Sequence, residues 1–235
     1  MNVLITGVSS GLGHGLAQVH LERGDSVWGL SRRNAPELAK NQKFHFQNID
    51  ITQLESMKTK MGQLLGDLDT LDLVYLNAGI LGQLEDLQKT RLDDLKIIMD
   101  TNCWANKGVI DSLTSLSVQM GQVIAISSSA SVNGNRGWGG YALSKAALNM
   151  LIQLYAQELR ETHFISLAPG LIDTAMQDYL CADVDDTIFS SVGKLKAARG
   201  TVNMPAPKEA AHRILNSLAQ LAELPSGSFA DIRNL

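Results

Sequence analysis

A tyrosine and a lysine four residues apart are the clearest candidates for chemistry in this sequence. Tyr141 and Lys145 begin and end the segment Tyr-Ala-Leu-Ser-Lys, and residues four apart share one face of a helix. A free phenol has a pKa of about 10, and lowering it to about 7 needs roughly 4 kcal/mol in favour of the phenolate. A cation about 4 Å away supplies at most that order of energy in a partly buried site. The pair could therefore act as a tuned proton donor.

The same pair also has an ordinary interpretation. Because charged residues make up about a quarter of average composition, about one tyrosine in twenty is followed by a lysine at this spacing. Alone, such a pair is more often two exposed residues of a helix than a catalytic couple. Its meaning depends on the motifs that accompany it.

A glycine-rich segment near the start of the chain is a candidate nucleotide-binding loop. The run Thr6-Gly7-Val8-Ser9-Ser10-Gly11-Leu12-Gly13 follows a β-type segment and opens a helical one, which is the context in which such loops bind dinucleotides. Glycines let the backbone approach a pyrophosphate, and a helix N-terminus offers free N–H groups. The alternatives are a plain strand–helix turn or the glycine-rich turn of a methyltransferase. We expect cofactor contacts from Gly7, Ser9, Ser10, Gly11, Leu12 and Gly13.

The residues after the second β-type run indicate which dinucleotide binds. NAD-binding domains usually place an acid about 20 residues after the glycines, for the ribose 2′-hydroxyl. Here the run ends in Leu30-Ser31-Arg32-Arg33, without an acid. Two guanidinium groups can pair with a 2′-phosphate instead. We therefore predict NADP(H), with NAD(H) possible, and a solvated arginine pair as the alternative interpretation.

The composition excludes several classes of protein. Of the 235 residues, 45% are hydrophobic and 19% charged, and the net charge of -4 includes no long basic run, so neither nucleic acid nor a membrane surface is an expected partner. Cys103 and Cys181 are isolated, so no metal site or disulfide is expected. The chain has no stretch of 18 apolar residues and starts with a β-type run, which leaves no signal peptide. We expect a cytoplasmic protein.

Strand-like runs alternate with helix-period segments along the chain. This alternation predicts an α/β fold: a Rossmann-like, doubly wound parallel sheet with helices on both faces. With no repeat or linker, residues 1–235 are expected to form a single domain. The expected strands are residues 2–6, 26–30, 44–48, 71–76, 122–126, 164–167 and 228–232, and the expected helices are residues 11–23, 53–65, 92–116, 141–159 and 208–221.

Three further motifs complete an ordered set. They are Asn77-Ala78-Gly79, a serine (Ser128) thirteen residues before Tyr141, and Pro169-Gly170-Leu171-Ile172-Asp173-Thr174. Each motif is weak alone, but the ordered set is specific. Over nearly its whole length the chain resembles the single-domain short-chain dehydrogenases/reductases. Only the segment at about 175–203 has no family signature, and the family itself varies there.

The resemblance implies four catalytic residues. Tyr141 is the expected general acid that protonates a carbonyl oxygen as hydride arrives, and Lys145 is expected to lower the tyrosine pKa and to bind the nicotinamide ribose. Ser128 is expected to hold the substrate oxygen; three serines adjoin there, and the family spacing selects this one. Asn102 matches the asparagine that holds a water in a proton relay to the lysine. Its ordinary interpretation is a helix-interior amide bonded to backbone, which is compatible with the relay.

The resemblance also implies the remaining cofactor contacts. Asp50, followed by Ile51, resembles the carboxylate that accepts from the adenine amino group. Asn77, Ala78 and Gly79 would line the adenosine side, where a larger side chain at 78 or 79 would clash. The nicotinamide carboxamide is expected at Pro169, Gly170, Ile172 and Thr174. One position departs from the pattern of NADP-preferring members, because Ser10 stands where these often carry a basic residue.

These residues together predict an NADP(H)-dependent carbonyl reductase or alcohol dehydrogenase acting on a small molecule. The alternative is an NAD(P)-binding sensor with little turnover. The substrate pocket is expected between Ser128 and Tyr141, with Asn133, Arg136 and Trp138, and in the segment after Thr174. A sugar epimerase is disfavoured, since the chain has no room for the C-terminal substrate domain of those longer relatives.

Two segments carry expectations about assembly and motion. Helix 141–159 is apolar nearly all round, so one face needs a partner beyond the sheet, and the resemblance implies homodimers or homotetramers built through it. Between Thr174 and Pro205 lie about thirty residues with no strand pattern and only broken helix periodicity, far more than the usual connection of about 4–6. We expect a lid that carries Met176, Tyr179 and Phe189; a pair of immobile surface helices is the alternative.

Overall fold

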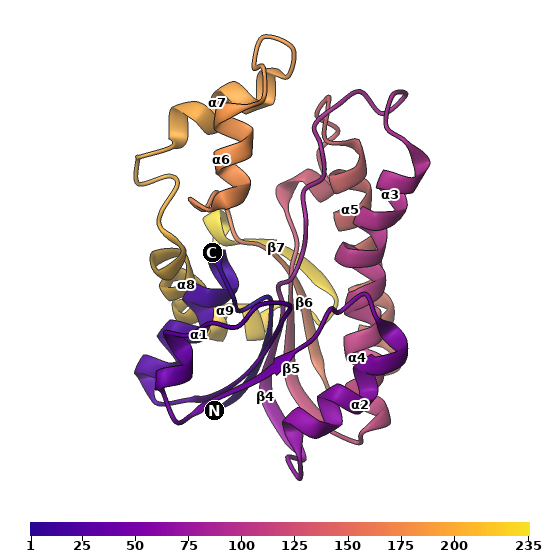
Figure 1. Ribbon diagram of the computed structural model, residues 1–235, viewed down its shortest axis with the longest axis vertical. Coiled ribbons are helices and arrows are strands. Elements are labelled where there is room, and N and C mark those ends of the chain that lie inside the picture. Colours follow the sequence, from indigo (N-terminus) through magenta and orange to yellow (C-terminus); the bar gives the residue numbers. More distant parts are fainter.

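Seven parallel strands form one sheet at the centre of the molecule (Figure 1). The computed structural model describes residues 1–235. The strand order β3-β2-β1-β4-β5-β6-β7, with helices on both faces, confirms the Rossmann-like prediction. The order reverses between β1 and β4, and in such sheets ligands bind outside the carboxyl ends of the strands at this point. The strands are β1 (Asn2–Thr6), β2 (Ser26–Ser31), β3 (Phe44–Asn48), β4 (Thr70–Leu76), β5 (Gln119–Ile126), β6 (His163–Ala168) and β7 (Ser228–Asp231).

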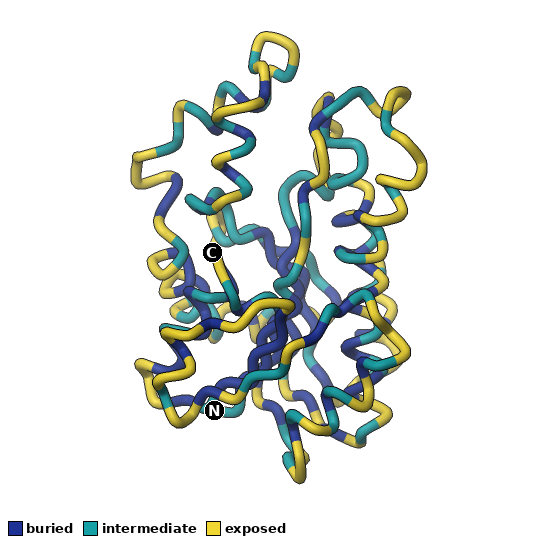
Figure 2. The backbone as a smooth tube through the Cα atoms, viewed as in Figure 1, coloured by how far each residue is buried: buried dark blue, intermediate teal, exposed yellow.

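Two layers of helices cover the sheet because side chains alternate along each strand. In β1, Val3 and Ile5 belong to one apolar core, while Leu4 between them belongs to the other. The first core is closed by α1 (Gly11–Arg23), α8 (Pro207–Asn216) and α9 (Leu218–Glu223). The second is closed by α2 (Leu54–Leu65), α4 (Ala105–Ser115) and α5 (Gly139–Glu158). Figure 2 shows the buried residues concentrated in the sheet between these layers.

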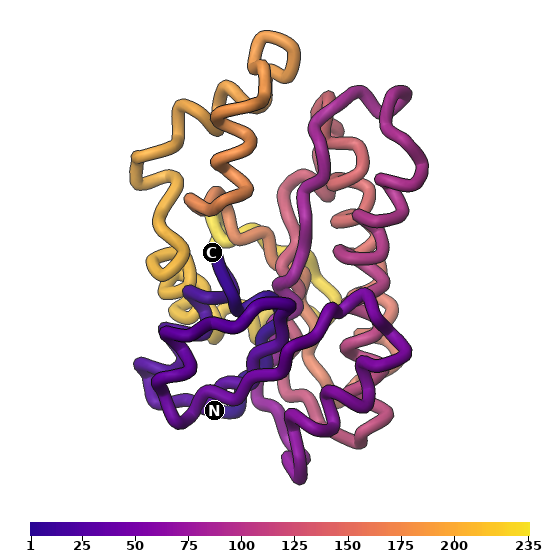
Figure 3. Tube along the Cα trace, viewed as in Figure 1, coloured from indigo at the N-terminus to yellow at the C-terminus, as the bar shows by residue number.

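The last helices return to the first one, as the colours of Figure 3 show. A Cβ atom on Gly15 of α1 would lie 2.6 Å from the carbonyl oxygen of Pro207 at the start of α8. Glycine is therefore required for this close approach of two helices. None of the helices has the length and apolar character needed to cross a membrane.

Two of the predicted helices are interrupted in the structure. The helix expected over residues 92–116 consists of α3 (Leu92–Met99), a π-helical turn (Asp100–Trp104) and α4. The helix expected over residues 208–221 ends at Asn216, and α9 begins two residues later. There the hydroxyl of Ser217 donates to the carbonyl of Arg213 at 3.0 Å, a local bond of the kind that competes with helix continuation. Apolar periodicity does not reveal either break.

The segment from Thr174 to Pro205, where the sequence shows only broken helix periodicity, contains two short helices. They are α6 (Ala175–Ala182) and α7 (Ser190–Ala198). Leu180 and Val192 are fully buried there, in a third apolar core shared with Leu81 and Leu84 on the far side of the cavity. Each helix is too short for its periodicity to stand out, and the apolar partners that stabilise them lie far away in the sequence.

Candidate active site

A cavity of about 1190 Å³ lies at the carboxyl ends of the strands, where the sheet topology predicts a ligand site. The loops after β1 to β6 and the inner sides of α6 and α7 line it. Of the catalytic and cofactor-binding residues expected from the sequence, two, Gly13 and Asn102, do not line it. All the others do: Gly7, Ser9, Ser10, Gly11, Leu12, Arg32, Arg33, Asp50, Ile51, Asn77, Ala78, Gly79, Ser128, Tyr141, Lys145, Pro169, Gly170, Ile172 and Thr174.

The glycine-rich loop forms a close-fitting floor. Gly7 has φ +79, a left-handed conformation that favours glycine, and its N–H donates to the Leu30 carbonyl at 2.7 Å. A Cβ atom on Gly13 would lie 2.3 Å from the Gly7 carbonyl oxygen. Gly13 therefore allows the first turn of α1 to pack against the loop, and does not itself reach the cavity.

Two helix N-termini converge on this floor. Ser10 caps α1 without any side-chain hydrogen bond, and no acid lies in the first turn. Thr174 stands at the N-terminus of α6, and its methyl group lies 3.5 Å from where a Cβ on Gly11 would be. The N–H groups of a first helical turn have no partner within the helix, and the helix dipole favours an anion there. The residues present fit a diphosphate.

The end of the cavity near β2 and β3 carries the two arginines. Both side chains are exposed, and neither forms an ion pair. Their backbone is held in place: Asn48 Nδ2 donates to the Arg32 carbonyl at 2.8 Å, and the Ser31 hydroxyl donates to the Arg33 carbonyl at 2.6 Å. The two guanidinium groups are thus available to an anionic ligand.

Asp50 is oriented by the residue two positions later. Its Oδ1 accepts from the N–H of Thr52 at 3.0 Å and from the hydroxyl of Thr52 at 2.7 Å. Burial raises the pKa of Asp50, but these two hydrogen bonds, with the charge of Arg32, hold that pKa below its usual value. A fixed, ionised carboxylate can accept a hydrogen bond from an amino group.

Asn77 links the ends of β1 and β4 through hydrogen bonds. Its Nδ2 donates to the Thr6 carbonyl at 2.8 Å, and the backbone N–H groups of Asn77 and Ala78 both donate to the Thr6 hydroxyl at 2.9 Å. At Gly79 a Cβ atom would lie 3.0 Å from Asn102 Oδ1 and 3.4 Å from Lys145 Nζ. A larger residue at 79 would therefore press on both side chains.

Tyr141 and Ser128 meet at the wall of the cavity. Tyr141 lies in the first turns of α5, and Ser128 precedes a short 3₁₀ turn (Ser129–Ser131) after β5. Burial raises the pKa of Tyr141, and a hydrogen bond with Ser128 opposes that rise. The lowering of this pKa by Lys145 stays a prediction. A phenol with a raised pKa is protonated at neutral pH and can donate a proton.

Lys145 lies almost fully buried behind the phenol. Its ammonium group is 5.7 Å from the centroid of the Tyr141 ring and donates to the Ile126 carbonyl at 2.7 Å. Burial lowers the pKa of Lys145 to about 8, against the charge of Cys103, and burial raises the pKa of that thiol to about 11. The lysine thus has its own backbone partner in this structure.

Asn102 lies beneath the cavity, in the π-helical turn. Its amide exchanges hydrogen bonds with the backbone of Ile80, at 2.8 Å in each direction, and donates to the Ser144 hydroxyl at 3.0 Å. Its backbone carbonyl accepts from Asn106 Nδ2 at 2.8 Å. The structure therefore matches the backbone-bonded alternative, and no hydrogen bond joins Asn102 to Lys145. π-helical turns occur frequently at functional sites.

The side chains expected in the substrate pocket divide into two groups. Asn133, Trp138 and Met176 line the cavity, and Leu180 and Leu195 lie beside them. The others instead join α6 and α7 to the opposite wall. Arg136 forms an ion pair with Asp86 at 2.6 Å and lies over the Phe189 ring, and the Tyr179 hydroxyl accepts from the Leu84 N–H at 3.1 Å.

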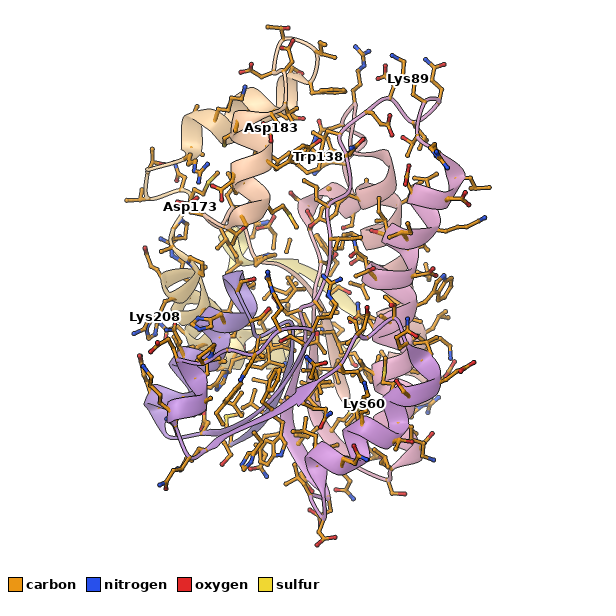
Figure 4. All side chains as sticks on the ribbon, in the orientation of Figure 1. Lys60, Lys89, Trp138, Asp173, Asp183 and Lys208 are labelled. Atoms are coloured by element: carbon orange, nitrogen blue, oxygen red, sulfur yellow. The ribbon has the colours of Figure 1, made fainter.

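Trp138 connects the two walls directly, and Figure 4 shows it between the lobe of α6 and α7 and the lobe of α5. Its indole N–H donates to the Ser191 hydroxyl at 2.8 Å. The cavity is thus bridged from above in this structure.

Several lining residues were not foreseen from the sequence. Arg233 lies in the C-terminal turn, with its aliphatic stem 3.9 Å from a Cβ built on Gly170 and its guanidinium paired with Asp231. Gln177 is buried and lines the cavity, and its Oε1 has no hydrogen-bond partner. Neither belongs to a motif. Arg233 reaches the cavity because the C-terminal segment returns to the sheet and pairs there with β6. Gln177 reaches it because α6 lies along the cavity.

The chain is similar to known oxidoreductases. The sequence profile of the short chain dehydrogenase family matches residues 1–185. Benzil reductase ((S)-benzoin forming) of Bacillus cereus is 27% identical over 241 residues, which cover 96% of each chain.

Solved structures share the fold. The crystal structure of the KRED1-Pglu enzyme superposes with a TM-score of 0.87 at 22% identity, covering 98% of this chain and all of the other. The structure of ElxO with NADP bound superposes with a TM-score of 0.79 at 23% identity, covering 98% of this chain and 96% of the other.

Proposed function

Because the chain belongs to the short chain dehydrogenase family of oxidoreductases, we propose that it is an NADP(H)-dependent carbonyl reductase or alcohol dehydrogenase. The observation that carries the proposal is the meeting of Tyr141, Ser128 and Lys145 on a cavity whose floor is a helix N-terminus with no side-chain cap and no acid in its first turn. A proton donor, a hydroxyl that can hold an oxygen and a cofactor cradle then share one space, as carbonyl reduction requires.

The cofactor is held along the floor of the cavity. The diphosphate binds at the N-termini of α1 and α6, and Asp50 accepts from the adenine amino group. The nicotinamide lies beside Pro169, Gly170, Ile172 and Thr174, with Asn77, Ala78 and Gly79 along the adenosine side. When bound, the nicotinamide supplies or accepts the hydride.

The proton is handled by the chain itself. Ser128 holds the carbonyl oxygen by a hydrogen bond from its hydroxyl, and Tyr141 donates its phenolic proton to that oxygen. Lys145 binds the nicotinamide ribose when the cofactor is present. Asn102 fixes Ile80 and Ser144, the neighbours of Gly79 and Lys145, through its hydrogen bonds, and a water beside it passes protons onward to Lys145.

Preference for NADP(H) over NAD(H) rests on Arg32 and Arg33. Both guanidinium groups lie at the adenosine end without ion-pair partners, and no acid follows β2. Guanidinium–phosphate pairs are strong, charge-assisted contacts. The binding of NADP by ElxO is consistent with this assignment.

The substrate is an aromatic ketone or aldehyde of the benzil type. Trp138, Met176 and Leu180 provide an apolar end of the cavity beside Tyr141, and a similar protein is a benzil reductase. Residues 1–235 form a single nucleotide-binding domain, in which residues 175–203 are the variable substrate segment. The protein acts in the cytoplasm as a homodimer or homotetramer.

Oxidation of NADPH, followed spectrophotometrically with benzil, aromatic aldehydes, ketones and quinones, tests this function. We expect turnover with benzil, and weaker turnover with NADH at equal concentration. If isothermal titration shows NADP(H) binding while no carbonyl compound is reduced, the chain is the alternative, a nucleotide-binding sensor.

A further inference from the structure

We propose that Asn149 is a positioning residue for the reaction: it holds the loop after β5 so that Ser128 faces Tyr141. Asn149 belongs to none of the sequence motifs. It follows Tyr141 and Lys145 on the same face of α5, since the three positions are spaced by four residues. The inference rests on the proposed function, because it assigns a role in that reaction.

The amide of Asn149 joins the two ends of the serine loop. Its Oδ1 accepts from the Ser127 hydroxyl at 2.6 Å, and its Nδ2 donates to the Ser131 hydroxyl at 2.8 Å. Ser127 and Ser131 stand on either side of the short segment that carries Ser128. One side chain of α5 therefore spans that segment.

The connection continues to the backbone of Ser128 itself. The Ser131 hydroxyl donates to the Ser128 carbonyl at 2.6 Å, and the Ala130 N–H donates to Ser128 Oγ at 3.1 Å. The orientation of the Ser128 hydroxyl thus depends on the turn that Asn149 closes. A hydroxyl that must hold a reacting oxygen needs this kind of fixed support.

Burial makes the bond to Ser127 obligatory. Ser127 is 2% exposed, and its N–H is already paired with the Leu167 carbonyl at 2.7 Å. Its hydroxyl is almost wholly shielded from solvent, and Asn149 is its hydrogen-bond partner in the folded chain. The amide is suited to this role because it accepts and donates at the same time.

Lys145 cannot replace Asn149 in holding the serine loop in position relative to α5. In the structure its ammonium group holds the Ile126 carbonyl, one residue before Ser127, but the proposed function assigns that group to the nicotinamide ribose. The hydrogen bonds of Asn149 with Ser127 and Ser131 do not compete with the cofactor, because no cofactor atom is assigned to this amide. Asn149 therefore keeps α5 aligned with the serine loop when the cofactor binds.

The test compares Asn149→Leu, which removes both hydrogen bonds at similar size, with Gln153→Leu. Gln153 lies one turn further along α5, is exposed and does not line the active-site cavity, so it controls for replacing an amide on this helix. The phenol of Tyr141 is titrated by ultraviolet absorbance in each protein, and the signal of the other tyrosines is subtracted with a matching Tyr141→Phe variant. Affinity for NADP(H) and kcat/KM for benzil are measured alongside.

Asn149→Leu should raise the pKa of Tyr141, because a misplaced Ser128 no longer stabilises the phenolate. It should lower kcat/KM roughly tenfold to a hundredfold while leaving cofactor affinity unchanged. Ser131→Ala, a milder change that removes only the link to the Ser128 carbonyl, should shift the titration in the same direction. Gln153→Leu should change none of these.

A loss of thermal stability with an unchanged phenol titration would mean that Asn149 is merely structural, and would overturn the proposal. If the wild-type protein reduces no carbonyl compound, the proposed function fails, yet the titration still decides whether Asn149 positions Ser128 against Tyr141.

Discussion

The phenol of Tyr141 has its proton affinity set by its surroundings. Burial raises its pKa, Ser128 opposes the rise, and the lysine four residues later directs its ammonium group to the Ile126 carbonyl. A protonated phenol beside a hydroxyl suits the reductive direction, in which the oxygen of the substrate gains a proton.

Replacing Tyr141 with phenylalanine should lower kcat by about 10²–10⁴-fold, the range typical of a lost general acid. Cofactor affinity should stay close to wild type, since the change removes a proton and little volume. Benzil reduction and isothermal titration with NADP(H) measure the two effects. Retention of most activity in the Phe variant would show that another group donates the proton.

The two arginines after β2 decide cofactor preference in our proposal. Arg32→Ala should weaken NADP(H) binding about tenfold or more, the effect of losing a hydrogen bond to a charged group, and should leave NAD(H) binding unchanged. Arg91→Ala, which changes an exposed arginine outside the cavity, is the control. Equal losses for the two cofactors would contradict recognition of the 2′-phosphate.

Among the elements, α6 and α7 are held by partners that lie far away in the sequence. They pack against Leu81 and Leu84 through the third apolar core, and Trp138 and Tyr179 add hydrogen bonds across the cavity. A lid held by a few such contacts can open and close without disturbing the sheet.

Hydrogen exchange with and without NADPH tests the lid. We expect residues 175–203 to become more protected when the cofactor binds, because closure excludes water from α6 and α7. Tyr179→Phe removes the acceptor of the Leu84 N–H and should reduce the protection that the cofactor gives to residues 175–203. Exchange in α1 should be the same in this variant as in the wild-type protein. Equal exchange in this segment with and without cofactor would show two immobile surface helices.

The outer face of α5 carries apolar side chains that the sheet does not cover. Leu143, Met150 and Leu154 are each more than half exposed. If this face joins two copies of the chain, Leu154→Glu should move the protein to monomers in sedimentation velocity, because it buries an unpaired charge. Ile188→Glu, at an exposed position outside α5, should not. An unchanged mass for Leu154→Glu would exclude this face.

For the whole molecule, a buried polar cluster joins α1 and the turn after it to β4. His20 is fully buried, with Nδ1 2.8 Å from Asp25 Oδ2 and Nε2 3.2 Å from the Tyr75 hydroxyl. Burial lowers the pKa of His20, against the opposing effect of Asp25. Burial raises the pKa of Asp25, but hydrogen bonds from His20 and the N-terminal ammonium group bring it below its usual value.

Both shifts make the fold weaker in acid. The unfolded chain takes up a proton on His20 near its ordinary pKa of about 6.5, whereas in the folded chain the lowered pKa keeps His20 neutral to lower pH. The contribution of His20 to the free energy of unfolding is therefore fully present above about pH 6.5 and is lost as the pH falls below it. Asp25 adds a further loss at lower pH. Urea unfolding between neutral pH and pH about 5 should show this decline, and His20→Gln should flatten it. If the His20→Gln variant loses as much stability as the wild-type protein between neutral pH and pH about 5, other groups cause the decline.

The sequence by itself determined the order of strands and helices and the cofactor loop, because both are written in short-range patterns. Apolar period and glycine spacing act within about a dozen residues. Together with the ordered motifs they predicted the Rossmann-like sheet and a set of catalytic and cofactor-binding residues of which all but Gly13 and Asn102 line the cavity.

Only the tertiary structure decided which of these residues face the cavity and which support it. Gly13 and Asn102 belong to the motifs yet lie outside the lining, while Arg233, Gln177 and the brace at Asn149 belong to no motif. The π-helical turn and the core under α6 and α7 depend on contacts between segments that are far apart in sequence. Such contacts exist only after the sheet has brought the segments together, and for that reason no local pattern contains them.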